Sequence, residues 1–309
     1  MVYADLVRSL FRQTVVKAVH MEDIRHVLYT SGYAKLACIR TERGIIILWR
    51  SQELIMVKMI VMDLDGTLLD ENKNISSYTL LILEKCKNHG IILALTTARS
   101  KNACNRIIEL VTPDVLILND GALIEHNNEN IYKKLLSAET TFGILNEFYL
   151  NKLNIKNISV ETEFNFYRSY TEFFHQDWDY GVYYDFLQPL SQESYKISAE
   201  IPNKEMAIDI NNKFKESKLV YNNGEKWYRY IHKDVGKMSG IEVVSKRLDV
   251  QISEVLAFGD DYNDIDMIKN CGIGVAMENS LKETKECANY VCKGNNEDGV
   301  ARWIEKNIL

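Results

Sequence analysis

The chain lacks the cysteine and histidine patterns of zinc sites and disulfide frameworks. Its six cysteines form no CxxC pair and lie in no His-rich spacing. It also lacks any apolar run approaching the ~20 residues that span a bilayer, because its longest apolar stretches, such as residues 45–49, are far shorter. These absences predict reduced thiols, a cytoplasmic location and no membrane anchor.

The chain also lacks an excess of positive charge. The 309 residues carry a formal net charge of −6, whereas proteins that bind nucleic acid or a membrane surface normally show a basic excess. The sequence therefore predicts small-molecule partners, with no nucleic acid and no membrane among them. A hydrophobic content of 46% and a charged content of 26% are typical of a globular protein with one large domain or two modest ones.

Apolar runs of strand length alternate with helical segments from residue 59 onward. Strands are expected at 59–62, 91–95, 115–118, 255–258 and 273–276. Ser76 or Ser77 can cap a helix that stops at Gly90, and Pro113 ends the next helix. This alternation predicts an α/β fold, a Rossmann-like parallel sheet core flanked by helices.

Two regions interrupt this pattern. Residues 138–222 predict a separate α/β insert, so that the core comprises 58–137 and 223–309. Its aromatic stretch, 164–186, contains Arg168 and His175 and is either packing core or a place where substrate specificity arises. Residues 1–57 precede the first core strand and are mildly basic. They are expected to be a short accessory segment or an upstream extension of the reading frame, since their acids disfavour a transit peptide.

The most informative motif is Asp63-Leu64-Asp65-Gly66-Thr67, directly after the first predicted strand. Carboxylates two residues apart at a strand end point the same way, so one can attack while the other manages protons. Gly66 allows a sharp turn there, at the edge where α/β sheets bind ligands. A plain turn would also explain these residues.

Three further loops carry groups that phosphate chemistry uses. Thr97 and Arg99 follow the second strand, where a hydroxyl and backbone N–H groups can hold phosphate oxygens, although Thr also caps helices routinely. Lys237 opens a predicted helix, where a cation opposes the macrodipole unless it faces an anion. Residues 259–264 concentrate oxygen ligands suited to Mg²⁺, or else form a solvated Asp-rich helix turn.

Together these four elements resemble the haloacid dehalogenase-like superfamily of aspartate-nucleophile phosphohydrolases, over residues 59–309. The similarity is greatest to the Cof-like sugar-phosphatase branch, which has an α/β cap inserted between its second and third motifs. The stretches 119–122, 274–280 and 296–300 add to the resemblance.

The resemblance implies a role for each motif. Asp63 would be the nucleophile and Asp65 the acid/base, which requires the pKa of Asp65 to lie above that of Asp63. Thr97 and Lys237 would bind the phosphoryl group. Mg²⁺ would be held by Asp63, Asp65 through its backbone carbonyl, Asp260 and Asp264. Further candidates near the substrate or the metal are Gly66, Arg99, Asn119 and Asn263.

The chain departs from that branch at three places: Thr97-Ala98-Arg99 stands for TGR, Asn119-Asp120-Gly121 for NG, and Met277-Glu278-Asn279-Ser280 for MGNA. None of these departures changes the implied nucleophile, acid/base, lysine or metal acids. The implied activity is therefore a Mg²⁺-dependent phosphatase acting on a small phosphate ester. The alternatives are a phosphomutase on the same scaffold and a non-catalytic regulatory or binding protein.

Overall fold

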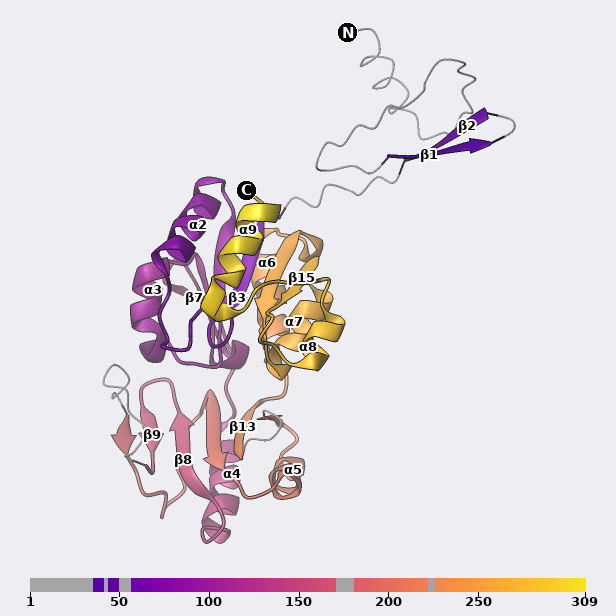
Figure 1. Cartoon of the computed structure of the whole chain (residues 1–309). Coiled ribbons are helices and arrows are strands. Elements are labelled where there is room, and N and C mark those ends of the chain that lie inside the picture. The colour runs from indigo at the N-terminus through magenta and orange to yellow at the C-terminus, as the bar shows by residue number, and fades with distance from the viewer. Residues whose placement is uncertain (1–35, 42–43, 50–56, 171–180, 222–225) are drawn as a thin grey trace. The chain divides into compact units, whose positions relative to one another are not determined.

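The computed structural model describes residues 36–41, 44–49, 57–170, 181–221 and 226–309 (Figure 1). The chain divides into two compact units, Met1–Met56 and Val57–Leu309. In the smaller unit, β1 (Leu36–Thr41) and β2 (Gly44–Trp49) pair antiparallel as a hairpin.

The larger unit contains an eight-stranded sheet in the order β16-β15-β14-β3-β4-β5-β6-β7. Its strands are β3 (Met59–Asp63), β4 (Ile92–Thr96), β5 (Val115–Leu118), β6 (Leu123–His126), β7 (Glu129–Lys133), β14 (Val255–Gly259), β15 (Ile273–Ala276) and β16 (Tyr290–Val291). The strands from β16 to β5 are parallel, and β6 and β7 add an antiparallel edge. The predicted α/β fold is confirmed, and the five predicted strands lie within one residue of their observed bounds.

Helices cover both faces of this sheet, because successive side chains of β3 point to opposite sides. Ile60 and Met62 pack toward α2 (Ser77–Asn88), α3 (Asn105–Val111) and α9 (Gly299–Asn307). Met59 and Val61 pack toward α6 (Lys237–Leu248) and α7 (Ile265–Asn270). The short α8 (Lys282–Cys287) contacts α7. The carboxyl ends of the parallel strands are thereby left uncovered by these helices.

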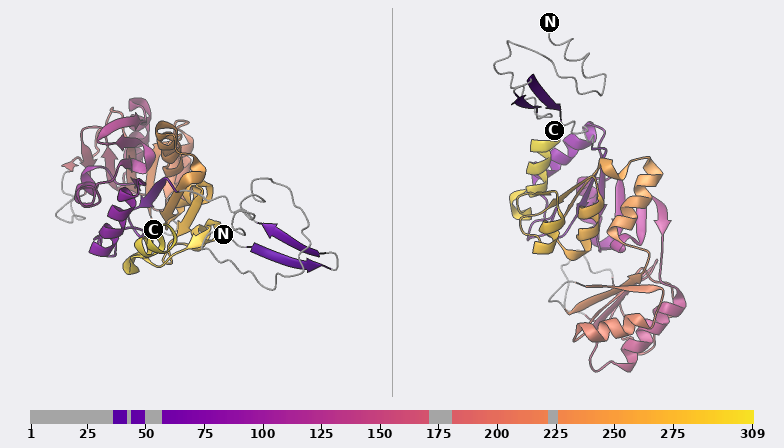
Figure 2. Two further views of the ribbon diagram at one scale, coloured as in Figure 1. Left: turned by 90° about the horizontal axis from the view of Figure 1, so that it is seen from above. Right: turned by 90° about the vertical axis from the view of Figure 1, so that its right-hand side faces the viewer.

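A second sheet of six strands has the order β10-β9-β8-β11-β13-β12. Its strands are β8 (Lys156–Glu161), β9 (Phe166–Arg168), β10 (Val182–Tyr183), β11 (Lys196–Glu200), β12 (Ser217–Tyr221) and β13 (Trp227–His232). The helices α4 (Ala138–Leu150) and α5 (Lys204–Asn212) pack on one face of it (Figure 2).

The insert was predicted to end at residue 222, and that boundary is wrong. Strand β13 pairs antiparallel with both β11 and β12, so the second sheet continues to His232. Local sequence shows that this segment is a strand, but only its hydrogen-bond partners decide to which sheet it belongs. Residues 171–180, which include the predicted specificity candidate His175, lie outside the described part of the chain.

None of the helices in the described residues is long and apolar enough to cross a bilayer. The cysteines whose side chains are described are all free thiols: Cys86, Cys104, Cys271, Cys287 and Cys292.

Candidate active site

The turn after β3 places Asp63 at the carboxyl edge of the sheet. Asp63 ends the strand and is only 6% exposed. Gly66 has φ +79°, a left-handed conformation that glycine adopts without steric cost. This turn brings Thr67 to a distant loop, where its hydroxyl donates a hydrogen bond to Oδ1 of Asp260 at 2.8 Å.

Lys237 is the first residue of α6 and joins two acids across the site. Its side chain is 2% exposed, and Nζ donates to Oδ1 of Asp63 and to Oδ1 of Asp264, each at 2.6 Å. A buried ammonium needs such partners, because removing a charge from water without compensation is costly. Lys237, which was expected to face an anion, therefore contacts the predicted nucleophile Asp63 directly.

Three carboxylates converge beside this lysine. Oxygens of Asp63, Asp260 and Asp264 all lie within 4.8 Å of one another. Asp264 closes the short helix η5 (Tyr262–Asp264), and its Oδ2 accepts hydrogen bonds from the backbone N–H groups of Asp260 and Asp261 at 3.0 and 3.1 Å. The predicted metal acids thus meet from the carboxyl ends of two adjacent strands, β3 and β14, while only the side chain of Asp65 lies outside this cluster.

The pKa values of Asp63 and Asp260 are raised, because Lys237 does not fully neutralise the negative charge of the cluster. Burial, with the nearby Asp264 and Asp260, raises the pKa of Asp63 despite Lys237. Burial and Asp264 raise the pKa of Asp260 to about 7. Burial alone would lower the pKa of Lys237, but the carboxylates of Asp264 and Asp63 outweigh this effect and raise the pKa. Clustered carboxylate oxygens that repel one another fit a divalent cation such as Mg²⁺.

This charge predicts a pH-dependent stability that Mg²⁺ removes. The pKa of Asp260 is about 7 in the folded state against 3.8 for the ordinary group, so the folded protein binds more protons between these values. Without divalent cations, the contribution of Asp260 to the free energy of unfolding should therefore fall as the pH rises from about 4 to 7, by at most about 4 kcal/mol. Urea unfolding with EDTA and with Mg²⁺ measures this. An equal pH slope in both would contradict it.

Asp65 lies in a different electrostatic environment from Asp63. Nε of Arg99 donates to its Oδ2 at 2.7 Å, Nη2 of Arg99 contacts Oδ1, and Nζ of Lys73 lies 2.7 Å from Oδ1. Burial raises the pKa of Asp65, but these two cations outweigh it and lower the pKa. These cations stabilise the charged form of Asp65, whereas the acid role that the resemblance implies needs the protonated form. Proton donation requires these ion pairs to open.

Replacing Lys73 by methionine should raise the pKa of Asp65, because one of its two cations is removed. If protonated Asp65 drives the first step, the alkaline limb of the pH–kcat profile should move upward by about half a pH unit. The matched control is Lys101→Met, which removes a lysine paired with Glu125 instead. An unmoved limb in Lys73→Met would contradict this assignment.

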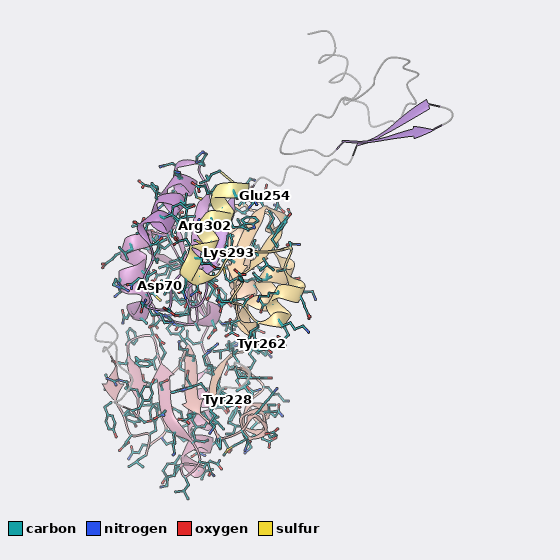
Figure 3. The ribbon with its side chains drawn as sticks, in the orientation of Figure 1. Asp70, Tyr228, Glu254, Tyr262, Lys293 and Arg302 are labelled. Carbon is teal, nitrogen blue, oxygen red and sulfur yellow. The ribbon has the colours of Figure 1, made fainter. Side chains whose placement is uncertain are left out.

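The remaining predicted residues surround the same sheet edge. Thr97 is buried, and its Oγ1 accepts a hydrogen bond from the backbone N–H of Arg99 at 3.1 Å. Asn119 is buried with φ +53°, and its Oδ1 has no hydrogen-bond partner within the described residues. Asn263 lines a cavity of about 430 Å³ together with Lys237 and Asp120. Another lining residue, Tyr262, is labelled in Figure 3.

Two residues that contact the site were not among the predicted ones. No sequence signal distinguishes the first, Lys73, from an ordinary surface lysine. Asp120, an unassigned residue in the 119–121 departure, forms an ion pair with Arg229 of β13, with Nε and Oδ2 3.2 Å apart. Burial raises the pKa of Asp120, but Arg229, Lys196 and Lys237 outweigh it and lower the pKa.

The turn at Gly66 should tolerate no side chain. A Cβ there would lie 2.3 Å from Oδ2 of Asp260, whereas one at Gly90, with nearly the same φ of +76°, meets nothing within 4 Å. Gly90→Ala should cost only about 1–2 kcal/mol for the left-handed backbone. Gly66→Ala should also displace Asp260 and lower Mg²⁺ affinity at least about 10-fold. Titration calorimetry of both variants measures this, and equal Mg²⁺ affinities would contradict the steric argument.

The fold and the buried Asp–Lys–Asp arrangement define an enzyme of the phosphohydrolase class. The chain belongs to the haloacid dehalogenase-like hydrolase family, whose sequence profile matches residues 60–304. The family resemblance inferred from the motifs is therefore confirmed.

Individual relatives agree with this membership. The chain is 30% identical over 268 residues to a Haemophilus influenzae protein with a provisional phosphatase name, covering 82% of this chain and 99% of that protein. It is 26% identical over 257 residues to 5-amino-6-(5-phospho-D-ribitylamino)uracil phosphatase YcsE of Bacillus subtilis, covering 82% and 96%. The solved structure of BT4131, a subclass IIB sugar phosphatase, shares the fold with a TM-score of 0.71 at 23% identity, covering 81% and 98%.

Proposed function

We propose that this enzyme is a Mg²⁺-dependent phosphatase that hydrolyses small phosphorylated metabolites, sugar phosphates or related cofactor phosphates, through an aspartyl-phosphate on Asp63. The observation that carries the proposal is the buried Asp63 carboxylate, bonded to Lys237 beside two further acids at the carboxyl edge of the sheet. A carboxylate held beside a fixed cation can approach an anionic phosphoryl group.

Two displacements account for the reaction. An oxygen of Asp63 bonds to phosphorus while the bond to the leaving oxygen breaks, and Asp65 donates its proton to that oxygen. A water molecule then attacks the phosphorus of the aspartyl-phosphate while Asp65 takes a proton from the water. The bond between phosphorus and Asp63 breaks and phosphate leaves. Lys237 and Thr97 hold the phosphoryl oxygens in both steps, and Asn263 orients the neighbouring acids or the water.

The carboxylates of Asp63, Asp260 and Asp264 would hold Mg²⁺, with the backbone carbonyl of Asp65. When bound, the ion neutralises negative charge between the nucleophile and the phosphoryl group. The six-stranded sheet with α4 and α5, residues 138–232, would act as the cap that excludes bulk water and selects the leaving group.

The test is release of inorganic phosphate from a panel of phosphorylated metabolites, with Mg²⁺ and with EDTA. Support requires Mg²⁺-dependent phosphate release from one or a few members. An isomerised ester without free phosphate would instead establish the phosphomutase alternative. No turnover of any member would favour the non-catalytic alternative.

A further inference from the structure

The second sheet has one face that its own helices do not cover, and polar side chains lie on that face beside the apolar Ile231 and Val220, which pack with the core. Ile197 and Tyr230 point to the other side and belong to the apolar cluster with α4 and α5. The uncovered face carries one cross-strand row in β9, β8, β11 and β13, which we call the Arg–Ser row: Arg168, Ser159, Ser198 and Arg229. The first three are at most 8% exposed, and the Arg229 side chain is 20% exposed. Buried arginines and serines on a sheet face need polar partners.

A second row on the same face adds charge. The side-chain period of two places Lys196 of β11, Glu161 of β8 and Lys218 of β12 there, and Nζ of Lys196 lies 3.3 Å from Oε2 of Glu161. The two rows together contain four cations and one acid, while the adjacent cavity that Lys218 lines is also lined by Asp120, Asp234 and Asp266. The excess of cations lies on the sheet itself, and this part of the sheet is suited to an anionic ligand.

Three of the cations reach the loops of the candidate active site. Nζ of Lys196 donates to the backbone oxygen of Ala98, directly after Thr97. Arg229 pairs with Asp120. Nζ of Lys218 lies 3.4 Å from the position that a Cβ on Gly236 would occupy, directly before Lys237. The polar face thus lies against the loops assigned to phosphoryl binding.

Two of these cations have spare binding capacity. The pair of Arg229 and Asp120 is loose, since its contacts are 3.2 and 3.5 Å and neither Nε nor the buried Oδ2 makes a hydrogen bond with any described residue. A guanidinium can form a bidentate pair with a carboxylate or phosphate. Lys218 lines the 430 Å³ cavity beside Lys237 and has neither an ion pair nor a hydrogen bond with any described residue.

We propose that Arg229 and Lys218 determine specificity by binding a second anionic group, a carboxylate or a phosphate, on the leaving group of the substrate. The preferred substrates are then phosphate esters of acids or bisphosphates, in place of neutral sugar monophosphates. Asp120 competes with the ligand for Arg229 and limits the affinity. This inference rests on the proposed phosphatase function and narrows its substrate class.

The test compares kcat/KM within matched pairs of esters. The carboxylate arm uses 3-phosphoglycerate against glycerol 3-phosphate and 6-phosphogluconate against glucose 6-phosphate. The phosphate arm uses fructose 1,6-bisphosphate against fructose 6-phosphate. The wild type should favour the acidic member in at least one arm, which identifies the kind of anion. p-Nitrophenyl phosphate reports phosphoryl transfer without either recognition group.

Substitutions then separate recognition from structure. Arg229→Gln and Lys218→Met should each lower the ratio of kcat/KM for the acidic over the neutral ester about 10- to 100-fold, mainly through KM. Asp120→Asn should act in the opposite direction and lower KM for the acidic ester, because Arg229 loses its competing carboxylate. Lys204→Met, which removes a lysine of α5, is the charge-matched control and should keep the ratio.

Each result that contradicts the proposals has a different meaning. Phosphate release from p-nitrophenyl phosphate without preference for any acidic ester would overturn this inference and leave the phosphatase function intact. Equal losses on acidic and neutral esters in Arg229→Gln and Lys218→Met, with KM unchanged in Asp120→Asn, would show a merely structural role and also overturn it. No phosphate release from any ester, including p-nitrophenyl phosphate, would overturn the proposed function itself.

Discussion

Asp63→Asn is expected to lower phosphate release by about 10⁴-fold or more, because a neutral amide cannot form the acyl phosphate that the carboxylate forms. The loss should not come from misfolding. Asparagine has nearly the same shape, and it removes one of three acids that lie within 4.8 Å of one another. Without Mg²⁺, the variant should therefore be as stable as the wild type or more stable.

Three measurements check this prediction. Steady-state phosphate release gives the loss in rate, mass spectrometry after rapid acid quench detects the phosphoenzyme, and thermal unfolding with EDTA gives the stability. The wild type should show phosphate bound to a peptide that contains Asp63, and the variant should show none. Detection of a phosphoenzyme in Asp63→Asn would show that another residue is the nucleophile.

Lys237→Met should have the largest effect on stability. It leaves the buried carboxylates of Asp63 and Asp264 without the ammonium that bonds both at 2.6 Å. Removing one partner of a buried ion pair typically costs about 3–5 kcal/mol. The same substitution should lower phosphate release about 100-fold or more, because a fixed positive charge on the phosphoryl group is lost.

The destabilisation should depend on pH with a definite sign. The pKa of Asp63 is raised in the folded protein, so this acid protonates readily as the pH falls and then needs no cation. The difference in unfolding free energy between wild type and Lys237→Met should shrink toward acid pH. Urea denaturation measures it, with Lys246→Met as the control, since that lysine is exposed in the last turn of the same helix. A constant difference across pH would argue against buried carboxylates as its cause.

Much of the core followed from local sequence. Apolar runs of four or five residues predicted five of the six parallel strands to within one residue, because a strand buried on both faces is apolar throughout, while the short, exposed β16 was not predicted. Ser76 caps α2 as expected, with its hydroxyl accepting from the backbone N–H of Thr79. Sheet order then places all loops that follow these strands at one edge, so the meeting of Asp63 with Asp260 and Asp264 could also be foreseen, whereas Lys237 follows β13 of the second sheet.

The errors occurred where long-range partners decide. The boundary of the second sheet was missed because hydrogen bonding to β11 and β12 assigns β13. The pairing of Asp65 with Arg99 and Lys73 was not foreseen either. Neither contact has a signal in the residues around it.

The sequence by itself therefore determined the fold class, the family and the acids and lysine of the candidate site, since periodicity, turn chemistry and motif spacing act over a few residues. Tertiary structure alone decided the contacts of the charges outside this cluster. Asp65 lies with Lys73, and Arg229 of the second sheet lies with Asp120 of the core, 109 residues away along the chain. Coulomb energies depend on distance and burial in space, and these quantities arise only when the two sheets are folded.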